Sequence, residues 1–188
     1  MKASLLTLGA LALSSASAAP ALFERGATQW MGTSLYFLQG LSDSDQNTYI
    51  DALSNYGIKV VRIWANSQAG GNACEKGSQI ATAVPAYETS IGSYNSATLD
   101  ALDYVMNKLV ANGIKVIISP HDGNSLLGNG DYREDIYYQT YGSSGFYTSS
   151  GARQAYKNRL NAMVNYKGKY SGQVWKNWTE AILAFDIQ

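Results

Sequence analysis

Arg62 lies inside the apolar run Val60-Val61-Arg62-Ile63-Trp64, which has the composition of a buried strand. An arginine in such a strand needs an anionic partner, because an unpaired buried charge is very costly. Strand alternation places Arg62 on the same face as Val60 and Trp64. Two interpretations stay open: Arg62 orients a catalytic carboxylate near the end of its strand, or it forms a salt bridge with Asp186 inside the sheet.

His121 is the only histidine and follows Ile117-Ile118-Ser119-Pro120, so we expect it at the mouth of a strand. There a neutral imidazole can hydrogen-bond a sugar hydroxyl or a carboxylate, although a lone histidine is often a satisfied structural group. One histidine and one cysteine provide no cluster of metal ligands, so the sequence predicts neither a metal site nor a cofactor. A serine–histidine hydrolase is disfavoured because the G-x-S-x-G motif is absent.

The elements that would position these residues follow a repeated pattern. Asn55-Tyr56-Gly57-Ile58-Lys59-Val60-Val61 recurs in outline as Ala111-Asn112-Gly113-Ile114-Lys115-Val116-Ile117. In each copy a glycine ends a helix and a β-branched run follows, the positions where glycine and strand residues are favoured. The expected strands cover 32–38, 58–64, 114–119 and 181–187, and the expected helices cover 43–56, 99–109 and 152–166. This β-α-β-α-β-α-β order indicates an α/β fold with a parallel sheet.

Two long segments, 65–96 and 120–150, leave the carboxyl ends of predicted strands. Structureless loops of such length are uncommon unless they bind or cover something, and barrel enzymes assemble their active sites at this end of the sheet. Decorative insertions are the alternative. The spacing of the aromatic residues in the second segment fits no single helix face, which favours exposed or cleft-lining rings, although we expect several of them to pack the segment itself. These aromatic residues are Tyr132, Tyr137, Tyr138, Tyr141, Phe146 and Tyr147.

The amino terminus predicts export. Lys2 precedes an apolar run over 3–13, and Ala16-Ser17-Ala18 fits an A-x-A cleavage site, so residues 1–18 are predicted to be a signal peptide and 19–30 an N-terminal segment. Removal of the signal peptide would leave one more acidic than basic residue, a balance that argues against nucleic acid or a membrane as partner. Cys74 either has a partner outside the chain or is a buried unpaired thiol.

With these residues in view, the chain resembles glycoside hydrolase family 5, most of all its fungal endo-β-mannanase-like members. The resemblance covers nearly all of residues 31–188, expected to be a partial catalytic domain. It rests on the order and spacing of five short segments rather than on any single motif. These segments are Gly32-Thr33-Ser34-Leu35-Tyr36, Val61-Arg62-Ile63-Trp64, Gly113-Ile114-Lys115-Val116-Ile117, Phe146-Tyr147 and Ala184-Phe185-Asp186-Ile187.

The resemblance implies the N-terminal half, about four βα units, of a (β/α)₈ barrel, and retaining hydrolysis of a β-1,4-linked, mannan-type plant cell-wall polysaccharide by two carboxylates. Arg62 matches an arginine that steadies the nucleophile, and Asp186 matches a supporting acidic position; His121 stands where relatives differ. We assign substrate contact to Tyr36, Trp64, Asn66, Asp122 and Tyr132.

One departure from the family concerns the reacting groups. In the family the fourth strand continues into Asn-Glu-Pro, whose glutamate is the acid/base, and the nucleophile follows on a later strand; the sequence ends at Gln188, before both. We therefore expect this secreted chain to be inactive by itself, the alternative being a sugar-binding or non-functional short product. Open strand edges would favour self-association.

Overall fold

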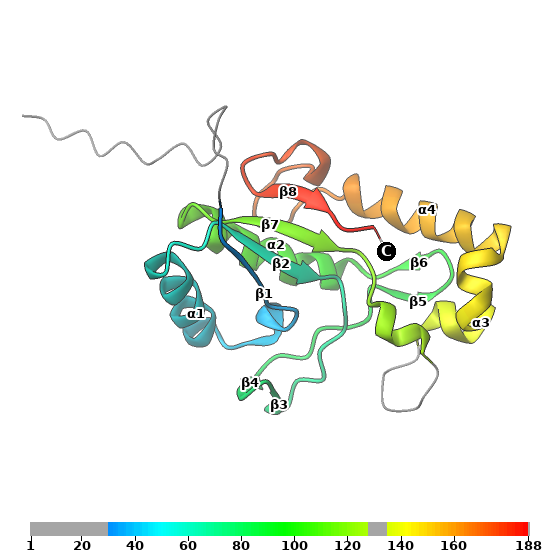
Figure 1. Ribbon diagram of the computed structural model, residues 1–188, viewed down its shortest axis with the longest axis horizontal. Coiled ribbons are helices and arrows are strands. Elements are labelled where there is room, and N and C mark those ends of the chain that lie inside the picture. The colour runs from blue at the N-terminus through cyan, green and yellow to red at the C-terminus, as the bar shows by residue number, and fades with distance from the viewer. Residues whose placement is uncertain (1–29, 128–134, 188) are drawn as a thin grey trace, which may run out of the picture.

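In the computed structural model, residues 30–127 and 135–187 are described, and a four-stranded parallel sheet lies at their centre (Figure 1). The strands occur in the order β1-β2-β7-β8, so each pairs with the strand nearest in the β-α-β series, as the sequence predicts. Their bounds are Gly32–Ser34 for β1, Val60–Trp64 for β2, Lys115–Ser119 for β7 and Ile182–Phe185 for β8.

Three long helices connect the strands: α1 (Asp43–Asn55), α2 (Ser96–Ala111) and α4 (Ser150–Val164). Each begins after a residue whose side chain accepts a hydrogen bond from a backbone N–H of the first turn, a favourable N-cap. Gly57 and Gly113 follow α1 and α2 with φ of 73° and 68°, a backbone conformation that costs glycine little. The prediction that these two glycines follow helix ends is confirmed, whereas α4 ends at Val164 instead of Tyr166.

The main core lies between the sheet and these helices. Val61 and Ile63 of β2, together with Val116 and Ile118 of β7, are buried there against apolar side chains of α1, α2 and α4. The opposite face of the sheet is more open: Arg62, Trp64 and Ile117 are only partly buried. The prediction of strands buried on both faces is therefore correct for one face and only partly so for the other, where Val60 and Ser119 are buried.

The first strand is shorter than predicted. β1 ends at Ser34 instead of continuing to Leu38, and Leu38–Gly40 forms a 3₁₀ helix, η1. Leu35, Phe37, Leu38 and Leu41 are all buried in the main core. A strand would place alternate side chains on opposite faces, so burying these four on one side requires the chain to turn.

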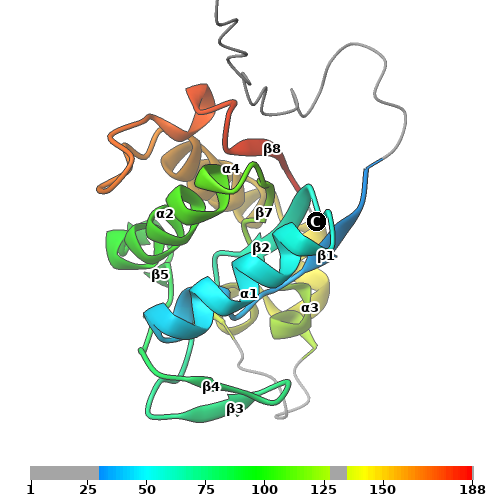
Figure 2. The ribbon, with the colours of Figure 1, turned by 90° about the vertical axis from the view of Figure 1, so that its left-hand side faces the viewer.

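Both long segments contain structure of their own (Figure 2). The first forms two hairpins, β3 (Ala73–Glu75) with β4 (Ser78–Ile80) and β5 (Glu88–Ser90) with β6 (Ser93–Tyr94). The second contains a 3₁₀ helix, η2 (Gly123–Leu126), and a helix, α3 (Ile136–Thr148), that is kinked at Gly142. A third 3₁₀ helix, η3 (Trp175–Asn177), precedes β8.

The aromatic rings of the second segment divide between the two interpretations, and its buried members pack the segment itself. Tyr137 and Phe146 are buried, and with Leu126, Ala155 and Tyr156 they form a second, smaller hydrophobic cluster. The kink in α3 lets rings from both halves of that helix meet, with Tyr137 and Phe146 edge to face at 5.4 Å. Within the described ranges, no helix has the length and apolar character needed to cross a membrane.

Candidate functional site

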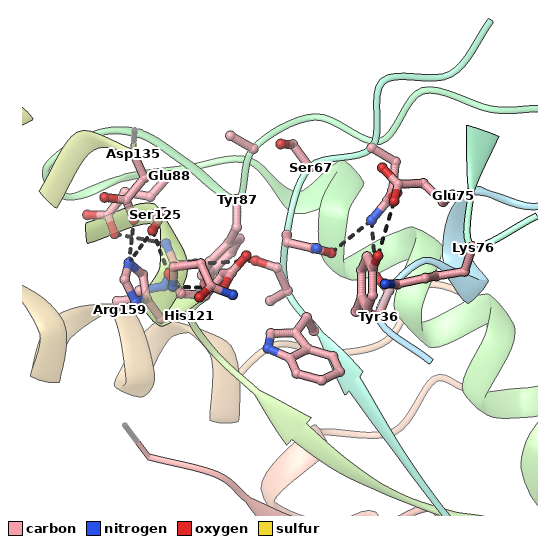
Figure 3. Close-up of a pocket in the computed structure, with 17 residues that line it drawn as sticks. Tyr36, Ser67, Glu75, Lys76, Tyr87, Glu88, His121, Ser125, Asp135 and Arg159 are labelled. Atoms are coloured by element: carbon pink, nitrogen blue, oxygen red, sulfur yellow. Dashed lines mark hydrogen bonds and ion pairs between the residues drawn. The ribbon is translucent and has the colours of Figure 1, made fainter. Parts of the chain in front are cut away.

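A cleft of about 760 Å³ opens where β1, β2 and β7 end, and both long segments contribute to its lining (Figure 3). This is the carboxyl end of the parallel sheet, as the sequence predicts for a barrel-type site. Four of the five predicted substrate contacts line it: Tyr36, Trp64, Asn66 and Asp122. The fifth, Tyr132, lies outside the described residues.

One wall carries the aromatic rings. Tyr36 and Trp64 stand edge to face with ring centroids 5.8 Å apart, and the Tyr36 hydroxyl donates to Glu75 Oε2 of the β3–β4 hairpin at 3.1 Å. Partial burial, followed by the hydrogen bond to Glu75, raises the pKa of Tyr36. The Asn66 amide is held between the amides of Gln39 and Gln68, at 2.8 and 3.1 Å. This wall therefore combines flat apolar rings with fixed polar groups.

The facing wall is built around His121, which is 3% exposed. Its Nε2 bonds the Asp135 carboxylate and lies 3.4 Å from Ser125 Oγ, so the serine and the acid share one ring nitrogen. A catalytic triad needs them on different nitrogens, so this group is not a serine nucleophile. Nδ1 of His121 is buried with no hydrogen-bond partner among the described residues.

Asp135 ties this wall to helix α3. Its Oδ1 accepts from the backbone N–H groups of Tyr137 and Tyr138, both at 3.0 Å, which caps the helix. Burial raises the pKa of Asp135, but the hydrogen bond and charge of His121, then the Tyr138 N–H and Arg159, outweigh it and hold the pKa below its ordinary value. The carboxylate is thus ionised and fully engaged.

Arg62 and Asp186 lie beside the cleft rather than in its lining. The Arg62 guanidinium bonds the Asp186 carboxylate and Ser119 Oγ, the latter at 2.8 Å, and lies 4.1 Å from the Trp64 ring centre. Of the two interpretations that the sequence left open, the structure has the salt bridge within the sheet. The predicted shared face of Arg62 and Trp64 is confirmed.

Sequence reasoning missed the buried pair at the back of the cleft, Glu88 and Arg159. Arg159 Nη1 donates to Glu88 Oε2 at 3.2 Å, and the two side chains are 6% and 0% exposed. One signal was available: Ala152, Ala155, Arg159 and Met163 recur at three- and four-residue steps on α4, which places Arg159 on its buried face.

Cys74 of the β3–β4 hairpin is a free, exposed thiol, so the alternative of a buried cysteine is wrong. In residues 30–127 and 135–187, no group of three or more histidine, cysteine, aspartate or glutamate side chains is arranged to hold a metal ion.

Residues 18–183 match the family model for cellulase (glycosyl hydrolase family 5). The chain belongs to glycosyl hydrolase family 5. Among curated relatives, mannan endo-1,4-beta-mannosidase 1 of Oryza sativa subsp. japonica is 28% identical over 165 residues, which is 83% of this chain and 35% of that protein. Mannan endo-1,4-beta-mannosidase F of Aspergillus fumigatus is 26% identical over 156 residues, 80% of this chain and 34% of that protein. The family 5 chain thus spans about a third of these relatives.

Solved structures support the fold of this family 5 chain. The endo-1,4-beta-D-mannanase of Thermotoga petrophila superposes with a TM-score of 0.59 at 20% identity, covering 85% of this chain and 44% of that one. The endo-1,4-beta-mannanase of Rhizomucor miehei gives 0.60 at 17% identity, covering 84% and 43%. With the parallel β1-β2-β7-β8 sheet, this confirms the predicted partial (β/α)₈ barrel.

Proposed function

We propose that the cleft is one part of the substrate site of a retaining glycoside hydrolase that acts on β-1,4-linked, mannan-type polysaccharide. The proposal rests on one observation: in this family 5 chain, two walls face each other across a cleft at the carboxyl end of the sheet. Tyr36 and Trp64 offer faces and edges for stacking against sugar rings, and Asn66 and Asp122 offer polar groups for hydroxyls. The mannan preference comes from the mannosidase relatives.

Retaining hydrolysis uses two carboxyl groups about 5–5.5 Å apart, one as acid/base and one as nucleophile. In this proposal Arg62 and Asp186 support those groups: the guanidinium, already held by Asp186 and Ser119, presents positive charge at the end of β2. The Arg62 and Asp186 side chains are 32% and 36% exposed, so both remain accessible to further partners.

The four carboxylates in the described lining of the cleft do not provide the reacting pair, because each is engaged. Glu75 accepts from Tyr36, Glu88 is paired with Arg159, and Asp135 is bonded to His121. Asp122 Oδ1 accepts from the Asn124 N–H at 3.0 Å and caps η2. We therefore propose that residues 1–188 bind sugar without cleaving it.

The test is to incubate the purified 188-residue protein with mannan and with cellulose, and to measure both reducing ends and retention in affinity electrophoresis. We expect retention by mannan and no turnover. The matched variants are Trp64→Ala, which removes a cleft ring, and Tyr147→Ala, which removes an exposed ring outside the cleft lining. Turnover by the wild type would refute the assignment of the cleft carboxylates, and equal retention of both variants would refute the cleft as sugar site.

We also propose secretion with cleavage after Ala18. Mass spectrometry of protein collected from the medium of an expressing host should then show a chain beginning at Ala19. Retention in the cells with Met1 intact would contradict this.

The sheet edges at β1 and β8 lead us to propose self-association. Within the described part of the chain, each edge strand has a neighbour on one side only, and Leu183 and Ile187 near the second edge are 37% and 66% exposed. Unpaired strand edges favour pairing with another chain. Size-exclusion chromatography with light scattering should show dimers or larger species, whereas a stable monomer at high concentration would count against the proposal.

A further inference from the structure

The Arg159 guanidinium joins two loops that follow neighbouring strands. Its Nε and Nη2 donate to the Pro120 carbonyl at 2.9 and 2.7 Å, and Nη2 also lies 3.4 Å from the Ala65 carbonyl. Pro120 directly follows β7 and Ala65 directly follows β2. One buried side chain of α4 therefore contacts the points where both strands leave the sheet.

These two strand exits carry the residues that face the cleft. Trp64 and Asn66 flank Ala65, and His121 and Asp122 follow Pro120. Arg159 donates to the backbone beside these four residues and not to their side chains. Any movement of the guanidinium would shift both walls of the cleft at once.

Glu88 fixes the guanidinium from the other side. Its Oε2 accepts from Arg159 and from the Tyr137 hydroxyl at 2.9 Å, while its Oε1 accepts from the Gly92 N–H at 2.6 Å. The Tyr87 ring also packs 4.8 Å from the guanidinium carbon. The pair thus joins the β5–β6 hairpin and α3 to the two strand exits.

A buried ion pair is a poor device for stability alone, because desolvation of the two charges offsets most of their attraction. An apolar pair would fill the same space at no greater cost. Apolar side chains lack the planar guanidinium of arginine, whose fixed N–H donors can bond a carboxylate and two carbonyls at the same time. The geometry therefore indicates placement of the strand exits as the role of the pair.

We propose that Arg159 and Glu88 are a positioning pair that sets the separation and orientation of the two cleft walls. Neither residue is catalytic: both act through the backbone at Ala65 and Pro120 and so through the residues beside them. This inference rests on the proposed function only in taking those residues as the sugar contacts.

The experiment combines amide hydrogen exchange with titration of mannohexaose. The main variant, Arg159→Lys, keeps the positive charge beside Glu88 but loses the fork that spans two carbonyls. The matched control is Arg153→Lys, the same change at an exposed arginine of the same helix. A second variant, Arg159→Met with Glu88→Gln, removes both charges together, so no lone charge stays buried if the lysine variant folds poorly.

Three amides report on the strand exits, because each is hydrogen-bonded there: Ala65 to Ser119 O, Gln68 to Val84 O and Ser125 to Asp122 O. We expect exchange at these amides to accelerate about tenfold or more in Arg159→Lys and in the double variant, while amides in the middle of α2 keep the wild-type rate. The affinity for mannohexaose should fall about tenfold in the same variants and remain unchanged in Arg153→Lys.

Unchanged exchange at the three amides, or the same acceleration throughout α2 and α4, would overturn the inference, since a merely structural pair loosens its surroundings without regard to the cleft. The exchange measurement requires no ligand. If the wild type binds no mannohexaose, the proposed sugar site fails, but local acceleration at the strand exits still supports the positioning pair and its absence still refutes it.

Discussion

The molecule contains two arginine–carboxylate pairs near its cleft, and they differ chiefly in burial. The side chains of Arg62 and Asp186 are 32% and 36% exposed, whereas those of Arg159 and Glu88 are 6% and 0% exposed. Besides its carboxylate partner, Arg62 contacts one hydroxyl and one aromatic ring. Arg159 contacts backbone carbonyls of two separate loops as well as its carboxylate partner. The first pair is accessible to additional partners, whereas the second is buried and already hydrogen-bonded to other groups of this chain.

The difference shows how one chemistry serves two purposes. Water screens the exposed pair, so its net contribution to the free energy of folding is small. The positive charge of Arg62 therefore remains available to further partners. The buried pair lacks that screening, and the cost of removing each charge from water is offset by the attraction of its partner. Removing one partner should therefore have very different consequences at the two places.

The largest effect is expected for Arg159→Met. This change leaves the Glu88 side chain buried without its Arg159 partner, which should lower the free energy of unfolding by about 3–5 kcal/mol in urea denaturation. The exposed counterpart Arg153→Met should change it by about 0.5 kcal/mol or less. A loss below about 1 kcal/mol for Arg159→Met would remove the contrast between the two pairs.

An intermediate effect is expected for Asp135→Asn, with a pH dependence. The folded pKa of Asp135 is below its ordinary value of 3.8, so its ionised form stabilises the fold above that value and the contribution is lost as the pH falls through the folded pKa. Asparagine still caps α3 but cannot pair with His121 as an anion. We expect Asp135→Asn to cost about 1–2 kcal/mol at pH 7 and clearly less at pH 3.

Urea denaturation at both pH values measures that difference. The control is Asp51→Asn on the exposed face of α1, which should show no comparable pH-dependent gap. A gap between wild type and Asp135→Asn that widens on acidification would contradict the direction of the pKa shift.

The smallest effect is expected for Asp186→Asn. Because both members of its pair are about one-third exposed, screening should limit the loss of folding free energy to about 1 kcal/mol or less, and added salt should reduce it further. A loss as large as that of Arg159→Met, measured under the same conditions, would show that the open pair also holds the fold together.

Much of the fold was predictable because its signals are local. Gly57 and Gly113 mark helix ends, and the apolar runs after them mark β2 and β7. Strand ends in turn placed Trp64 and His121 at one edge of the sheet, where the structure has them. The same locality explains the error at β1, since four buried residues between Leu35 and Leu41 need a turn that alternation does not reveal.

The rest depended on contacts between distant parts of the chain. Glu88 and Arg159 are 71 positions apart, and no local pattern links a hairpin residue to a helix residue at that distance. Which aromatic rings pack the second segment could not be predicted for a different reason: Tyr137 and Phe146 would lie on opposite faces of a continuous helix, and only the kink at Gly142 brings their rings together.

The most direct test of the account is a titration of the 188-residue protein with mannohexaose, followed through the indole N–H of Trp64 in two-dimensional NMR spectra. We predict saturable shifts of this signal and of the Asn66 amide, with none at Tyr104 and Tyr170, which lie outside the cleft lining. Shifts confined to Tyr104 and Tyr170, or none at any residue up to millimolar sugar, would contradict the assignment of this cleft as the sugar site.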